Sequence, residues 1–121
     1  MFLATSNRTK QLLLLSYIQQ VRAEELNHGQ GDIQALLAEL KPGFRLLVDF
    51  SRLESMDPDC MTEIGRAMEL IDQSGVAMVV RVIPDPRKDI GMNILAIFHY
   101  MHHPQTAVCQ TMTEAAKLLS L

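Results

Sequence analysis

The amino-acid sequence predicts an α/β domain with a mixed, mainly parallel β-sheet, and three observations support this fold class. Along the 121 residues, the hydrophobic pattern alternates repeatedly between strand-like and helix-like periods. The runs at 44–50 and 76–83 are nearly continuously apolar, as expected for strands that are covered on both faces. Residues 2–5 and 11–21 follow one another across a short polar turn, which favours an antiparallel pair at one edge.

The first half of the chain is predicted to contain strands at 2–5, 11–21 and 44–50, with one helix before the third strand. The polar, glycine-containing segment NHGQG, residues 27–31, is predicted to be an irregular loop. Asp32 is then the expected N-cap of the helix, and Lys41-Pro42-Gly43 ends it. The apolar face of this helix repeats at i, i+3, i+4 and i+7, in Ile33, Leu36, Leu37 and Leu40.

The second half continues the alternation of helices and strands. A helix over 58–74 is followed by Gly75 and a strand over 76–83. A loop at 84–89, a helix at about 90–101 and a short strand at 106–110 come next. Thr111 and Glu114 form a capping box for the last helix. Its predicted core face is Ala115, Leu118 and Leu119.

Composition narrows the class of protein. With 48% hydrophobic residues, residues 1–121 are predicted to form one domain. The net charge of −3 and the mixed charges argue against a nucleic-acid partner. No unbroken apolar run, that at 12–15 included, is long enough for a membrane span, and no secretory signal is visible. Two cysteines fit a reduced compartment, so a cytoplasmic location is expected.

The order of these elements, and the run FRLLVDFSRLESMDPDCMTEIGRAMELIDQSGVAMVVRVI, resemble the STAS domain of bacterial anti-sigma-factor antagonists, the SpoIIAA-like family. Members have an apolar strand, an Asp-Ser-Ser-Gly-like turn that opens a helix, and a last helix similar to TMTEAAKLL. The resemblance covers nearly the whole chain. It implies a mixed sheet with about four helices packed largely on one side. It also implies binding of a protein partner at the turn and helix, switched by serine phosphorylation.

The sequence departs from the family at the switch itself. Aligning Asp57 with the leading aspartate places Pro58 and Asp59 at the two serines, and Cys60 at the glycine. Asp59 therefore stands at the phosphoacceptor position and carries a fixed charge, whereas a phosphoserine carries about −1.5 to −2. We expect a non-enzymatic regulatory module whose binding surface is permanently set. Its partner is expected to be an anti-sigma-factor-like kinase or another regulator. The predicted partner-binding residues are Asp57, Pro58, Asp59, Cys60, Met61 and Thr62.

The same residues also make a good helix start. Asp57 suits the N-cap, Pro58 the first helical position, and Asp59 the positive end of the helix dipole. Each contributes roughly 0.5–1 kcal/mol, so capping alone is an alternative to a binding surface. Two acids can share a proton in catalysis, but no nucleophile or base accompanies them. No catalytic residue and no cofactor are predicted.

A competing hypothesis is a small-ligand site at the carboxyl ends of the strands, between residues 57–61 and 84–89. Arg52, Asp85, Arg87 and Lys88 would line this rim and hold a lipid, a nucleotide or another anion. The sequence has no glycine-rich phosphate loop, and Asp59 occupies the helix start that would hold a phosphate. A solvated charged rim is the alternative.

The remaining candidates lie between residues 90 and 109. His99, His102 and His103 precede Cys109, but Pro104 biases His103 away from helix and no further ligand completes a metal site. No metal is therefore predicted, and Cys109 is expected to be buried. The helix at 90–101 carries a second apolar strip that includes Met92, Leu95 and His99. This strip is either buried in the monomer or makes a homodimer.

Overall fold

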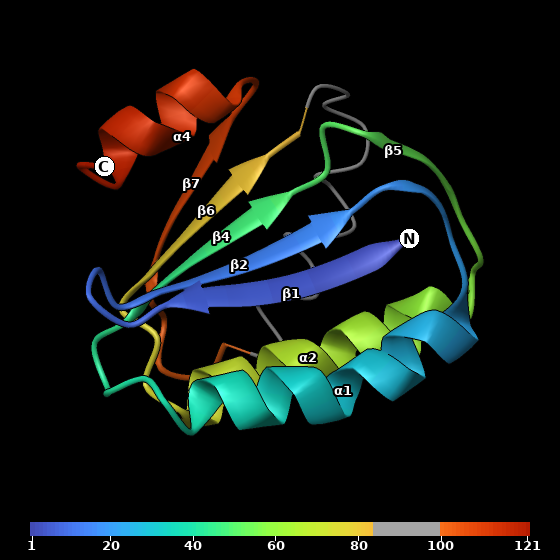
Figure 1. Ribbon diagram of the computed structural model, residues 1–121, viewed down its shortest axis with the longest axis horizontal. Coiled ribbons are helices and arrows are strands. Elements are labelled where there is room, and N and C mark those ends of the chain that lie inside the picture. Colours follow the sequence, from blue (N-terminus) through green and yellow to red (C-terminus); the bar gives the residue numbers. More distant parts are fainter. Residues whose placement is uncertain (84–99) are drawn as a thin grey trace.

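The computed structural model describes residues 1–83 and 100–121, and its main sheet has five strands in the order β1-β2-β4-β6-β7. Strand β1 pairs antiparallel with β2, and the other neighbours are parallel. Figure 1 shows this twisted sheet with β1 and β7 at its edges. The prediction of a mainly parallel sheet with an antiparallel edge pair is confirmed. The strands are β1 (Phe2–Asn7), β2 (Leu12–Tyr17), β4 (Arg45–Asp49), β6 (Met78–Val82) and β7 (Gln105–Cys109).

Helices cover both faces of the sheet. Helices α1 (Ala23–Leu37) and α2 (Cys60–Gln73) lie side by side on one face, and α4 (Met112–Leu118) lies on the other (Figure 1). The described residues thus place two helices on one side and one on the opposite side. The predicted helix at 90–101 and the loop at 84–89 fall almost entirely outside the described residues.

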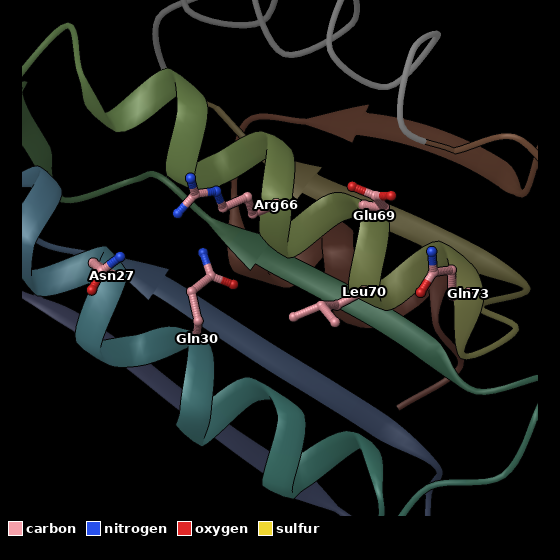
Figure 2. A pocket seen from close by; sticks show the side chains of 6 residues that line it. All are labelled: Asn27, Gln30, Arg66, Glu69, Leu70 and Gln73. Carbon is pink, nitrogen blue, oxygen red and sulfur yellow. The ribbon is translucent and has the colours of Figure 1, made fainter.

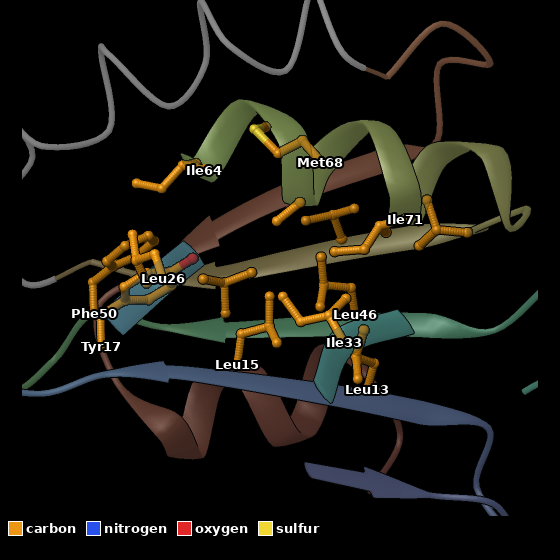
Figure 3. Packing of buried hydrophobic residues seen from close by; sticks show 14 of the residues in the cluster. Leu13, Leu15, Tyr17, Leu26, Ile33, Leu46, Phe50, Ile64, Met68 and Ile71 are labelled. Carbon is orange, nitrogen blue, oxygen red and sulfur yellow. The ribbon is translucent and has the colours of Figure 1, made fainter. Parts of the chain in front are cut away.

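Each face of the sheet has its own apolar core. The larger core fills the space between the sheet and the two helices α1 and α2, as Figure 3 shows for Leu15, Leu46 and Ile64. The smaller core joins the other face to α4 through residues such as Val80 and Leu119. Alternate residues of the central strands enter the two cores, because successive side chains of a strand point to opposite faces. This accounts for the continuously apolar runs in the sequence.

The predicted loop at 27–31 is wrong, because these residues lie inside α1. The helix begins at Ala23, and Glu24 and Glu25 occupy its first turn, where carboxylates complement the helix dipole. Gly29 faces the Phe2 ring so closely that a Cβ there would lie 2.7 Å from the ring. Gly29 therefore allows the helix to pack closely against Phe2. The polar residues around it led to the wrong prediction of a loop.

The predicted single strand at 11–21 is divided in two. Residue Gln19 has a φ of +57°, and from this residue on the chain forms β3 (Gln19–Val21), which is not part of the main sheet. It pairs parallel with β5 (Leu53–Met56) in a separate two-stranded sheet. Strand β5 was also not predicted, because its polar sequence LESM carries little strand signal. This small sheet determines where the turn before α2 lies.

The final helix starts as predicted. Thr111 Oγ1 accepts a hydrogen bond from Glu114 N at 3.2 Å, and Glu114 Oε2 accepts one from Gln110 N at 3.2 Å. Ala115 and Leu119 are buried, but Leu118 is 45% exposed, so its assignment to the core face is wrong. The helix is short and ends at Leu118. Of the residues Leu118 and Leu119, Leu119 reaches the core.

Candidate functional site

The turn between β5 and α2, residues 57–59, is fixed to the end of β3. Val21 pairs with Met56, and its carbonyl oxygen accepts a hydrogen bond from Asp57 N at 3.3 Å. The thiol of Cys60 donates to the same carbonyl oxygen at 3.6 Å. Val21 itself is fully buried. One strand end in the core therefore sets the position of the whole turn.

The start of α2 differs from the predicted cap. The first helical residue is Cys60, and Asp59 precedes it with φ −66° and ψ −16° and makes no side-chain cap hydrogen bond. The N–H groups of Cys60 and Met61 instead donate to the backbone carbonyls of Asp57 and Pro58, at 3.0 and 3.2 Å. The prediction that the Asp57 carboxylate caps the helix is wrong, because backbone carbonyls satisfy these donors. No hydrogen bond of either carboxylate is found within the part of the chain that the structure describes.

The predicted binding residues divide into an exposed set and one buried thiol. Asp57, Pro58, Asp59 and Thr62 are exposed, and Met61 is 39% exposed. Cys60 is fully buried, which corrects its assignment to a partner-binding surface. Burial raises the pKa of its thiol, and the charges of Asp57 and Asp59 raise it further. The thiol supports the turn from inside and is a poor nucleophile.

A hollow of about 370 Å³ lies between this turn and the junction of β3 with α1. We call it the turn hollow; it is lined by Gln20, Arg22, Ala23, Glu24, Asp57 and Asp59. Three carboxylates and one guanidinium surround it, so its lining is predominantly acidic. The residues from β3 and α1 were missed, because the start of α1 was not recognised. The acidic pair Glu24 and Glu25 was the available signal for a helix start at this point.

Of the four residues predicted to line the ligand rim, Arg52 is the one that lies within the described residues. It is exposed, in the turn between β4 and β5. The Arg52 carbonyl accepts a hydrogen bond from Gln19 N at 2.8 Å, which links this turn to β3. Asp85, Arg87 and Lys88 lie outside the described residues. The predicted self-association residues Met92, Leu95 and His99 lie outside them as well.

Two of the histidines considered as metal ligands are described, and one has a partner. His102 Nδ1 lies 3.3 Å from Asp72 Oδ2, at the end of α2, and Cys109 is buried in β7 as predicted. In residues 1–83 and 100–121, no three acidic, histidine or cysteine side chains are grouped as metal ligands. The helices within those ranges also include none that is long and apolar enough to cross a membrane.

The comparisons with known proteins find the fold but not a sequence family. No family model matches the chain, and no curated protein matches it. Among solved structures, the anti-sigma factor antagonist SpoIIAA in its unphosphorylated form is similar with a TM-score of 0.64 and 17% identity. The alignment covers 99% of this chain and 98% of SpoIIAA.

Two further solved structures show the same likeness. An uncharacterised protein with a SpoIIAA-like fold from Shewanella loihica has a TM-score of 0.72 and 11% identity, covering 98% of this chain and 92% of its own. An anti-sigma factor antagonist from Mycobacterium paratuberculosis has a TM-score of 0.59 and 16% identity, covering 100% of this chain and 94% of its own. Together with the strand order and the helix-opening turn, these matches lead to one conclusion: the chain has the SpoIIAA-like fold of STAS domains, as its sequence resemblance predicted.

Proposed function

We propose that this protein is a non-enzymatic, cytoplasmic regulatory module that binds a protein partner through the turn at 57–59 and the first turn of α2. The observation that carries this proposal is the state of the two carboxylates. Asp57 and Asp59 are both exposed, and neither is used to cap the helix that follows them. The side-chain hydrogen bond of the capping explanation is therefore absent, which leaves the helix dipole at Asp59 and a charged surface for a partner as the reasons for these residues.

The fold supports the same proposal. The similar structures include SpoIIAA from Bacillus in a phosphorylated form as well as an unphosphorylated one. In the alignment of the motif, Asp59 stands where the phosphoacceptor serine is expected. A carboxylate there cannot be phosphorylated by a serine kinase, and it carries its negative charge permanently. We infer that the charge of this binding surface does not change, and that an anti-sigma-factor-like kinase or another regulator binds it.

Affinity capture from the native cell with wild-type protein and with Asp59→Arg tests this function. Asp59→Arg reverses the charge at an exposed position with no hydrogen bond to lose, so the fold should be kept. We expect at least one captured protein to be lost with Asp59→Arg. The matched control is Glu39→Arg, which makes the same charge change at an exposed residue beyond the end of α1.

Purified partner and isothermal titration calorimetry then give the size of the effect. A loss of binding of at least about tenfold, or about 1.4 kcal/mol, is expected for Asp59→Arg. Asp59→Ser should weaken binding less, because it removes the charge without reversing it. If both variants at position 59 bind every partner as the wild type does, the turn is not the binding surface.

A further inference from the structure

A second hollow lies between α1 and α2. Figure 2 shows it in front of the sheet, bordered by side chains from both helices. Its volume is about 420 Å³, and we call it the α1–α2 groove. The lining residues are Asn27 and Gln30 from α1, and Arg66, Glu69, Leu70 and Gln73 from α2.

The lining has the chemistry of a peptide main chain. Three of the six side chains are carboxamides, each of which presents an N–H donor and a C=O acceptor together. A peptide unit presents the same pair of groups, so an exposed carboxamide such as that of Gln73 can bond to it on both counts, whereas the Gln30 amide already donates to Glu63. The other polar residues are one cation and one anion, Arg66 and Glu69, and Leu70 supplies an apolar surface. This set suits an extended chain better than it suits a compact ion.

Gln30 joins α1 to α2 in the wall of the groove. Its Nε2 donates to the Glu63 backbone oxygen at 2.7 Å, and because that oxygen can only accept, the orientation of the amide is fixed. The Gln30 Oε1 atom is buried and accepts no hydrogen bond within the described part of the chain. Figure 2 shows this oxygen on the side of the amide toward Leu70. This oxygen is out of contact with solvent, so Gln30 links the two helices and does not itself bind an occupant.

The groove shares one face of α2 with Asp59, although none of the turn residues 57–59 lines it. Exposed residues follow one another at intervals of three and four, which places them on one side of the helix. Arg66 and Gln73 are separated by about 10 Å along the axis, at a rise of about 1.5 Å per residue. That length accommodates about three residues of extended chain at about 3.3 Å each. The exposed face consists of Asp59, Thr62, Arg66, Glu69 and Gln73.

Charge indicates what the occupant carries. Arg66 is already paired with Glu63 at 3.3 Å, and Asn27 also donates to the Glu63 carboxylate at 3.4 Å. The Asp59 carboxylate at the start of this face and the Glu69 carboxylate in the groove are exposed. A lysine or arginine side chain of the occupant therefore meets uncompensated negative charge.

We propose that the α1–α2 groove binds an extended, lysine- or arginine-containing segment of the protein partner that contacts the turn at 57–59. The segment lies along α2, with its main chain against the exposed carboxamides of Asn27 and Gln73 and an apolar side chain against Leu70. The identity of this partner rests on the proposed function, but the peptide-binding property of the groove does not.

The test uses a displayed library of short linear peptides, selected on the immobilised full chain and then measured singly by fluorescence anisotropy. We expect enriched peptides to contain lysine or arginine, and Glu69→Lys to weaken their binding at least about tenfold. The matched control is Glu39→Lys, the same charge reversal at an exposed residue outside the groove, which should leave binding unchanged. Circular dichroism melting of the three proteins checks that all are folded.

Two results would overturn the groove proposal: no enrichment of any linear peptide, or equal binding of the selected peptides to Glu69→Lys and Glu39→Lys. No partner is present in this measurement, so its result is independent of capture with Asp59→Arg. If Glu69→Lys weakens peptide binding but Asp59→Arg captures the same proteins as the wild type, the groove is a binding site and the turn is not. If Glu69→Lys leaves peptide binding unchanged but Asp59→Arg loses a captured protein, the turn is a binding surface and the groove proposal is wrong.

Discussion

Gly29 and Gly31 are two glycines of the same helix whose surroundings differ completely. A Cβ on Gly29 would lie 2.7 and 2.8 Å from Phe2 ring carbons, whereas a Cβ on Gly31 would meet nothing within 4 Å. The Phe2 ring is not free to move without cost, because it packs against Tyr17 with ring centroids 5.0 Å apart. Gly29 is thus required by packing, and Gly31 is not.

The two alanine substitutions should therefore have opposite effects. Gly31→Ala is expected to stabilise the protein by about 0.5–1 kcal/mol, because alanine loses less backbone entropy in a helix. Gly29→Ala has the same helical gain but must displace the Phe2 ring, at a cost of about 1–3 kcal/mol. Urea unfolding of the two variants measures the difference directly. Equal free energies of unfolding for Gly29→Ala and Gly31→Ala would show that the Phe2 ring moves away from α1 at little cost.

At the scale of elements, the end of α2 is held to the segment that enters β7 by one buried carboxylate. Asp72 is buried, and it accepts hydrogen bonds from the backbone N–H groups of Met101 at 2.7 Å and His102 at 3.3 Å. The His102 ring lies 3.3 Å from the same carboxylate. An acidic residue near a helix C-terminus is unfavourable with respect to the dipole, so these contacts explain its presence there.

Asp72→Asn should destabilise the fold by about 1.5–3 kcal/mol, because the amide places a donor where the carboxylate accepts from backbone N–H groups. The matched control is Glu69→Gln, an exposed carboxylate on the same helix, for which a change within about 0.5 kcal/mol is expected. Free energies of unfolding in urea give both values. Similar small losses for the two variants would mean that Asp72 does not anchor the segment.

Several elements were predictable because their signals are local. The capping box at Thr111, the helix over Cys60–Gln73 and the buried strands all follow from short patterns that tertiary contacts did not override. The start of α1 and the β3–β5 pair were not predicted. For the start of α1 the local signal, Glu24 and Glu25, was overlooked, whereas β3 and β5 are joined by the pairing of Val21 with Met56, which are far apart in sequence. No window of neighbouring residues contains both partners.

At the scale of the whole molecule, the buried acidic groups predict a loss of stability at alkaline pH. Burial raises the pKa of the Cys60 and Cys109 thiols above the ordinary value of 9.0, and that of Tyr17 and Tyr100 above 10.0. The folded state therefore holds these protons more tightly than the unfolded state does. The resulting stability is complete below the unfolded pKa values and declines as pH rises through them.

Urea unfolding between neutral pH and about pH 10.5 should show a falling free energy of unfolding from about pH 9 upward. The double variant Cys60→Ala and Cys109→Ala is expected to move the onset of the decline toward the ordinary phenol value of 10.0, because of these four groups the two tyrosines are left. An onset that is the same in the variant and the wild type would exclude the thiols as its origin.

Local patterns in the sequence were enough to predict the α/β class, the mainly parallel sheet with an antiparallel edge, and the position of an acidic turn before α2. These properties depend on hydrophobic period and on residue types within a few positions of one another. Three features depend on the packing of the folded chain: Cys60 faces inward, backbone carbonyls satisfy the start of α2, and residues of α1 adjoin the turn. Each of these depends on the pairing of β3 with β5 and of α1 with α2, and such pairing brings together segments that the sequence keeps apart.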